Sequence, residues 1–215
     1  MFKELKNTDS QNLKAYVEFD TVKLEDTRAY SAMFFNIVVC LLGAFYINSA
    51  VAVKIVEVVF ILICAVFMLW FKFKVSKTQA NIMFYYAGFM CAMSVNLCFV
   101  SCLFFSTSEV GFLIPAVIFV VLVPVIAFAT MKKESRKIIK GSYLNQTSGK
   151  SPLLAGACVA GAGLGIFLSR LLGDELGEGI LLGFCCGFLG LILAMVAFYF
   201  VKGYCHWLVE KIETE

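Results

Sequence analysis

Six long runs of apolar residues account for most of this chain and leave little sequence for anything else. A helix that crosses the hydrocarbon core of a bilayer needs about 20 predominantly apolar residues. Six segments of the chain reach or approach that length. The sequence therefore predicts six transmembrane helices, at residues 31–48, 51–71, 81–105, 111–131, 152–172 and 179–201.

The composition supports the same class of protein. The 215-residue chain is 61% hydrophobic and 15% charged, whereas a soluble domain is about half apolar and about a quarter charged. The apolar runs are continuous, whereas the strands of a membrane β-barrel alternate apolar and polar residues. We therefore predict an all-α, polytopic membrane helix bundle over residues 31–201, with no separate soluble domain.

The two ends of the chain are polar. Residues 1–30 have mixed charge and lack the apolar run of a signal peptide. This N-terminal segment favours a short helix lying on the membrane surface, although a short strand over 17–24 fits nearly as well. Residues 202–215 are expected to form a cytoplasmic tail. The apolar face of the surface helix would consist of Leu13, Tyr16, Val17 and Leu24.

Charge is distributed unevenly among the connections. All but two of the 18 basic residues, the exceptions being Lys54 and Arg170, lie in residues 1–30, 72–79, 131–150 and 202–215. Basic connections stay on the cytoplasmic side of a membrane, so both termini are predicted to be cytoplasmic. The net charge of +3 reflects this asymmetry and does not indicate a nucleic-acid partner. Size and span number are similar to those of small bacterial permease subunits, so we expect the bacterial cytoplasmic membrane.

The connection at residues 131–150 is the longest and the most basic. Glu134 is its only acidic residue. Such a segment predicts contact with the anionic lipids of the bilayer. Docking of another membrane or cytoplasmic subunit on this segment is the second interpretation.

Small residues recur at every fourth position in the last two predicted spans, so each set lines one stripe of a helix. In lipid, helices associate through close packing, and glycine lets a second backbone approach. We expect the second stripe to pack against the first stripe or against another subunit. The two stripes are Ala157, Gly161 and Gly165, and Gly179, Gly183 and Gly187.

Few polar residues lie inside the predicted spans. The amides of Asn36 and Asn96 need partners in hydrocarbon, so both are predicted to face the bundle interior. A structural bridge and a contact with a substrate or ion both remain open for Asn96. Glu57 lies three residues from Lys54 and is either the partner of a lysine that reaches the interface or a carboxylate lining an ion path.

The connection between the last two spans is acidic. Asp174, Glu175 and Glu178 either mark the outer side of the membrane or concentrate cations at the mouth of a pathway. In the fourth predicted span, Pro124 removes a backbone donor and clashes with the carbonyl of Val120. The sequence therefore predicts a helix kink at Pro124.

No sequence pattern indicates catalysis. HExxH, GxSxG and Walker motifs are absent. The single histidine, His206, adjoins Cys205, but neighbouring residues on a helix diverge by about 100°. The nine cysteines include no CxxC pair, so neither a metal site nor another cofactor is predicted. The chain is not expected to be an enzyme.

These observations favour a transport component, either a small permease or a substrate-binding membrane subunit that moves a solute or ion. Six spans, buried amides and a kinked helix support this hypothesis. The glycine stripes favour an alternative: a homo-oligomeric channel, or a toxin-immunity or phage-defence membrane protein. The mass of the protein in mild detergent distinguishes them, because a ring of identical subunits favours a channel.

Overall fold

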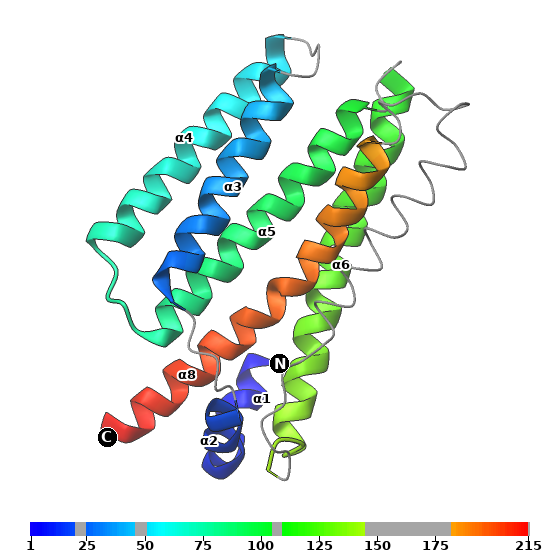
Figure 1. Ribbon diagram of the computed structural model, residues 1–215. Coiled ribbons are helices and arrows are strands. Elements are labelled where there is room, and N and C mark those ends of the chain that lie inside the picture. Colours follow the sequence, from blue (N-terminus) through cyan, green and yellow to red (C-terminus); the bar gives the residue numbers. More distant parts are fainter. Residues whose placement is uncertain (20–24, 46–50, 105–108, 145–181, 215) are drawn as a thin grey trace.

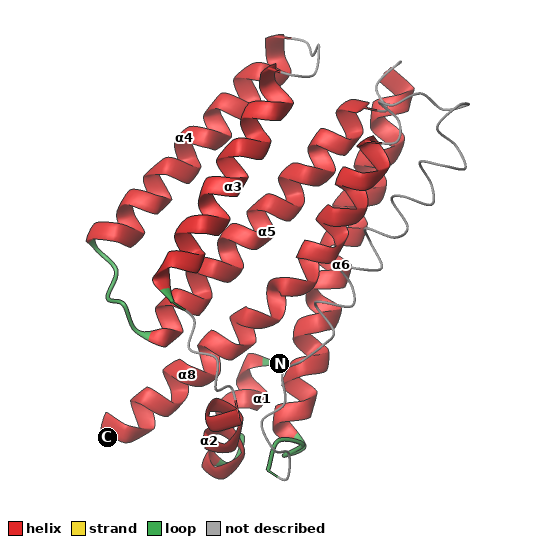
Figure 2. Ribbon diagram, viewed as in Figure 1, coloured by secondary structure: helices red, strands yellow, loops and turns green. Residues whose placement is uncertain are grey.

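The computed structural model describes residues 1–19, 25–45, 51–104, 109–144 and 182–214. These residues form helices and no strands, which confirms the all-helical class (Figure 2). Residues 182–194 form a helix that continues into the last two elements. The other elements are α1 (Phe2–Lys6), α2 (Ser10–Phe19), α3 (Asp26–Phe45), α4 (Val51–Phe73), α5 (Gln79–Phe104), α6 (Glu109–Ile139), the 3₁₀ turn η1 (Met195–Ala197) and α8 (Phe198–Thr214).

Three helices in the described part of the chain are long and apolar enough to cross a membrane: Gln79–Phe104, Ile114–Ile139 and Leu182–Thr214. The predicted number was six. The span at 152–172 lies outside the described residues, and the spans at 31–48 and 51–71 correspond to α3 and α4. Among the described residues of these two segments there is one shorter apolar helix, Val58–Phe73, and α3 begins in polar sequence.

Helix α6 extends further than the sequence analysis expected. It passes Met131 and ends at Ile139, so the start of the segment interpreted as a loop is helical. Lysine, arginine and glutamate are good helix formers, and neither glycine nor proline interrupts this stretch. Gly141, whose φ is +65°, closes the turn that follows the helix. The amide of Ser142 donates to the carbonyl of Lys137, and that of Gly141 to Ile138, which is the Schellman pattern of a helix C-terminus. Similarly, α8 makes most of the expected tail helical.

Helix α5 lies at the centre of the bundle. It packs against α3, α6 and α8 and is extensively buried (Figure 1). The outer helices α4 and α6 instead expose large apolar side chains, among them Leu62 and Val66 on α4 and Val117 and Val120 on α6. Monomeric soluble proteins rarely expose large contiguous apolar surfaces. The outer surface of this bundle therefore suits a hydrocarbon environment.

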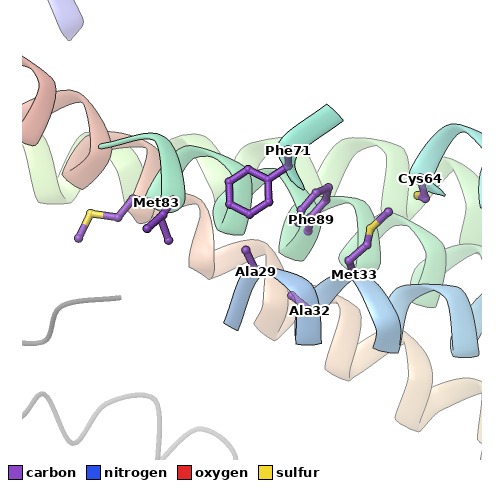
Figure 3. Packing of buried hydrophobic residues seen from close by; sticks show 8 residues of the cluster. Ala29, Ala32, Met33, Cys64, Phe71, Met83 and Phe89 are labelled. Atoms are coloured by element: carbon purple, nitrogen blue, oxygen red, sulfur yellow. The ribbon is translucent and has the colours of Figure 1, made fainter. Parts of the chain in front are cut away.

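The first core cluster joins α3, α4 and α5. Figure 3 shows the ring of Phe71 beside Phe89 and Ala29, and Phe71 is fully buried. Lys77, in the α4–α5 connection, places its ammonium 3.3 Å from the centroid of the Phe71 ring. The same ammonium donates to the carbonyl of Phe71 and, at 3.4 Å, to the hydroxyl of Tyr30. Lys77 thereby fastens the end of α4 to α3.

The two N-terminal helices pack on protein, so Leu13 and Tyr16 of the expected surface face are buried inside the bundle, while Leu24 lies outside the described residues. Leu5 of α1 and Leu13 and Tyr16 of α2 are buried in a second core cluster. Burial against the ends of α6 and α8 removes these apolar side chains from water, which stabilises the contact. The partners on α6 and α8 are Ile138, Val201, Cys205, Leu208 and Val209.

A carboxylate reinforces this N-terminal contact. The hydroxyls of Tyr16 and Tyr143 donate to Oε1 of Glu134, at 3.3 and 2.7 Å. Lys137 approaches Oε2 of the same carboxylate at 3.5 Å, and the side chain of Glu134 is 15% exposed. Hydrogen bonds to a charged acceptor are stronger than neutral ones. Glu134 therefore ties α2 and the chain beyond α6 to the last turns of α6.

Candidate functional site

Two asparagines from different helices meet inside the bundle. Asn36 of α3 is fully buried, and Asn96 of α5 is 4% exposed. The Nδ2 of Asn96 donates to the Oδ1 of Asn36 at 3.3 Å. The Nδ2 of Asn36 donates to the Sγ of Cys64 on α4 at 3.6 Å. These three residues, which we call the amide layer, connect three helices through buried polar groups.

Helical periodicity explains why Asn36 faces the interior. Ala29, Ala32 and Met33 are buried on α3, and Asn36 follows Met33 by three residues and Ala32 by four. Residues at these spacings share one face of a helix. The face of α3 that contributes apolar side chains to the core near the start of the helix therefore places the amide of Asn36 in the core further along.

The amide layer is suited to binding polar groups rather than to proton transfer. Carboxamides donate and accept hydrogen bonds but do not change charge near neutral pH. Leaving an amide without a partner in an apolar interior costs several kcal/mol, on the order of 2–7. Each asparagine of the layer reduces that cost for the other. The acceptor for Asn36, however, is a sulfur, which accepts hydrogen bonds only weakly.

A second set of polar contacts lies between α5 and the 182–194 helix. Three side chains of α5 donate to the backbone carbonyls of three glycines. The order of the donors along α5 is opposite to the order of the acceptors, so the two helices run antiparallel. The contacts are Ser94 Oγ to Gly190 (2.6 Å), Cys98 Sγ to Gly187 (4.0 Å) and Ser101 Oγ to Gly183 (2.6 Å).

The absence of side chains on the glycines makes this approach possible. A Cβ on Gly187 would lie 2.6 Å from the Cζ of Phe119 on α6 and 2.8 Å from the Oγ of Ser101. A Cβ on Gly190 would lie 2.7 Å from the Sγ of Cys98 and 2.9 Å from the carbonyl oxygen of Ser94. Real Cβ atoms are essentially never this close to other heavy atoms. A side chain at Gly190 would therefore push the two helices apart, whereas one at Gly187 would first displace the side chains of Phe119 and Ser101.

The buried stripe continues well beyond the three glycines that the sequence analysis selected. Its positions alternate in steps of four and three residues, the spacing of a coiled-coil seam. Gly179, Ala157, Gly161 and Gly165 lie outside the described residues, as does any contact between the two predicted stripes. The helix that meets Gly183 and Gly187 is α5, a partner that the sequence analysis did not name. The described stripe is Gly183, Gly187, Gly190, Ala194, Ala197 and Val201, all buried.

Of the other predicted pathway residues, none can be joined to the amide layer. Asp174, Glu175 and Glu178 lie outside the described residues, and so does the side chain of Glu57, although its backbone belongs to α4. Helix α6 continues on both sides of Pro124, and the kink there stays a prediction.

Sequence reasoning missed several residues of these contacts. The cysteines were considered as metal ligands, but Cys64 and Cys98 were not identified as hydrogen-bond partners, and Gly190 was outside the four-residue spacing. One signal was present: Ser94, Cys98 and Ser101 follow one another by four and three residues, so these small donors share a face of α5. Small hydrogen-bonding residues at that spacing are typical of helix contacts in membranes.

No protein-family model, curated protein or solved structure matches the chain. Within the described ranges, no group of histidine, cysteine, aspartate and glutamate residues is arranged to hold a metal ion. The functional interpretation consequently starts from the amide layer and the helix contacts around α5.

Proposed function

We propose that this chain is a six-span protein of the bacterial cytoplasmic membrane and acts as a transport component for a small polar solute. The observation that carries the proposal is the amide layer, because polar residues buried among membrane helices commonly belong to substrate or ion pathways. In this proposal the solute passes between α3, α4 and α5. The Asn36–Asn96 bond closes the path when no solute is present.

The distribution of charge supports the proposed orientation. Figure 1 places both termini, the α4–α5 connection and the end of α6 at one end of the bundle. Lys3, Lys74, Lys140 and Lys211 lie in these segments. Basic residues favour the cytoplasmic side, so this end faces the cytoplasm and the α5–α6 connection faces outward.

The weak acceptor at Asn36 supports a solute that carries oxygen atoms. A hydroxyl or carbonyl oxygen accepts an amide N–H more strongly than the sulfur of Cys64 does. A solute oxygen therefore competes with the sulfur of Cys64 for the Nδ2 of Asn36, and a solute oxygen that instead accepts from the Nδ2 of Asn96 replaces the Oδ1 of Asn36 and lets the asparagines separate. Neither amide is charged, which favours neutral solutes over ions.

A permeability assay tests this function. Purified protein in phosphatidylcholine liposomes is exposed to gradients of glycerol, urea or K⁺, with light scattering and a potential-sensitive dye as readouts. We expect the parent protein to accelerate entry of glycerol or urea. The double variant Asn36→Leu/Asn96→Leu removes both amides together and should reduce entry to the rate of protein-free liposomes.

Asn81→Leu is the matched control. Asn81 lies on the same helix as Asn96, but at its exposed start, where Nδ2 donates to Ser76. This variant should transport like the parent. A parent protein that matches protein-free liposomes for every probe would contradict the proposal, as would full transport by the double variant. Entry of K⁺ into the liposomes, together with a ring of identical subunits in detergent, would instead support the channel hypothesis.

A further inference from the structure

The basic residues that the sequence analysis assigned to a loop instead form a cationic face on the last turns of α6. The basic side chains recur at spacings of three and four residues, so they share one half of the helix surface. All of them are exposed. We call Lys132, Lys133, Arg136, Lys137 and Lys140 the α6 basic face.

The opposite side of these turns is fixed to the protein. Ser135 and Ile138 are buried, and Ile138 belongs to the second core cluster with α2 and α8. Among the described residues, the only ion pair of the α6 basic face joins Lys137 to Glu134. The other four cations project from the helix and form no ion pair with an acidic residue of the described chain.

Helix length places this face at the level of lipid headgroups. Helix α6 has 31 residues, which at about 1.5 Å per residue gives roughly 46 Å, against about 30 Å for the hydrocarbon core. Almost none of the apolar part of Ile114–Ile139 is buried by the described protein, so in the proposed membrane bundle this part faces lipid. Lys132 lies over the exposed ring of Phe128, at 5.9 Å from its centroid, and marks the change from apolar to basic surface.

We infer that the α6 basic face binds the phosphate groups of anionic phospholipids in the leaflet next to it. The cations match the charge of these headgroups, and each basic residue near an anionic membrane surface adds to the attraction. Because the α6 basic face begins where the lipid-exposed part of α6 ends, the headgroups of surrounding lipids reach it directly. This inference rests on the proposed membrane insertion and not on the transport activity.

Thermal unfolding in detergent with added lipid tests the inference. The test variant changes Lys132, Lys133, Arg136 and Lys140 to glutamine and keeps Lys137 with Glu134. Phosphatidylglycerol should raise the Tm of the parent by about 5 °C more than phosphatidylcholine does, and the variant should lose most of this difference. High salt should have the same effect as the substitutions, because it screens exposed charges.

Two further variants keep the outcome decisive. Exchanging lysine and arginine at the same four positions preserves the charge and should preserve the phosphatidylglycerol effect. Changing Lys3, Lys6, Lys72 and Lys74 to glutamine removes the same charge elsewhere and should leave most of the phosphatidylglycerol effect in place. Equal loss in this control would overturn the inference, because net charge alone would then explain binding.

The competing ligands are tested in the same assay. Stabilisation of the parent by inorganic phosphate or by polyglutamate as strong as that by phosphatidylglycerol would overturn the inference, in favour of a simple anion or an acidic protein. Equal effects of phosphatidylglycerol and phosphatidylcholine would also overturn it. The transport proposal would survive each of these results, because permeability is measured in phosphatidylcholine liposomes.

Discussion

Gly190→Ala is expected to destabilise the protein, whereas Gly88→Ala is not. A Cβ at Gly190 meets the backbone oxygen of Ser94 and the sulfur of Cys98, while a Cβ at Gly88 meets nothing within 4 Å. Forcing extra volume into a packed contact costs about 1–3 kcal/mol. Both substitutions share the intrinsic gain of alanine over glycine in a helix, about 0.5–1 kcal/mol. The difference in stability between the two variants therefore reports on the contact between α5 and the 182–194 helix.

Unfolding in mixed micelles of increasing sodium dodecyl sulfate fraction, followed by circular dichroism, measures both variants. Gly190→Ala should unfold at a lower fraction than the parent, and Gly88→Ala at the same or a higher one. Gly190→Leu should accumulate poorly or aggregate during purification. If Gly190→Ala were as stable as Gly88→Ala, the close approach at Gly190 would not contribute to the fold.

Single replacement of either asparagine in the amide layer is the second change with a large expected effect. Asn96→Leu leaves the Oδ1 of Asn36 without its donor in a buried position. A buried polar group without a partner costs about 1–3 kcal/mol. The double variant Asn36→Leu/Asn96→Leu removes both amides, so its loss should be smaller than the sum of the two single losses.

The same micelle titration measures this coupling. Contacting residues typically show a coupling energy of roughly 0.5–3 kcal/mol, and we expect a value in that range for Asn36 and Asn96. Asn81→Leu combined with Asn36→Leu is the control pair and should be additive. Additivity within error for Asn36 and Asn96 would show that their hydrogen bond does not stabilise the bundle.

The apolar runs were sufficient to predict helices, because a membrane helix must be long and apolar whatever its neighbours are. They were not sufficient to locate helix ends. Helix α6 continues through charged residues to Ile139, since a neighbouring cluster buries Ile138 and supports the extra turns. In the N-terminal segment, periodicity identified Leu13 and Tyr16 as one face, but nothing local distinguished a lipid surface from α8 as its partner.

Contacts between helices were harder to predict than the helices. Asn36 and Asn96 were expected to face inward because of their polarity, yet their mutual hydrogen bond depends on the packing of α3 on α5. Glycine spacing indicated a close approach without specifying the helix that approaches. The small donors on α5 formed a second spacing pattern in the sequence. Pairing this pattern with the glycine stripe requires knowing that the two helices are neighbours.

Cysteine accessibility in intact cells tests the central claim, a membrane bundle whose basic end is cytoplasmic, most directly. Ser142→Cys reports on the connection after α6, and Thr107→Cys on the connection between α5 and α6. The parent protein controls for labelling of native cysteines. We predict that a membrane-impermeant maleimide labels Thr107→Cys in intact cells and Ser142→Cys only after the membrane is permeabilised. Labelling of Ser142→Cys from outside intact cells would contradict the orientation, and with it the account of the basic end.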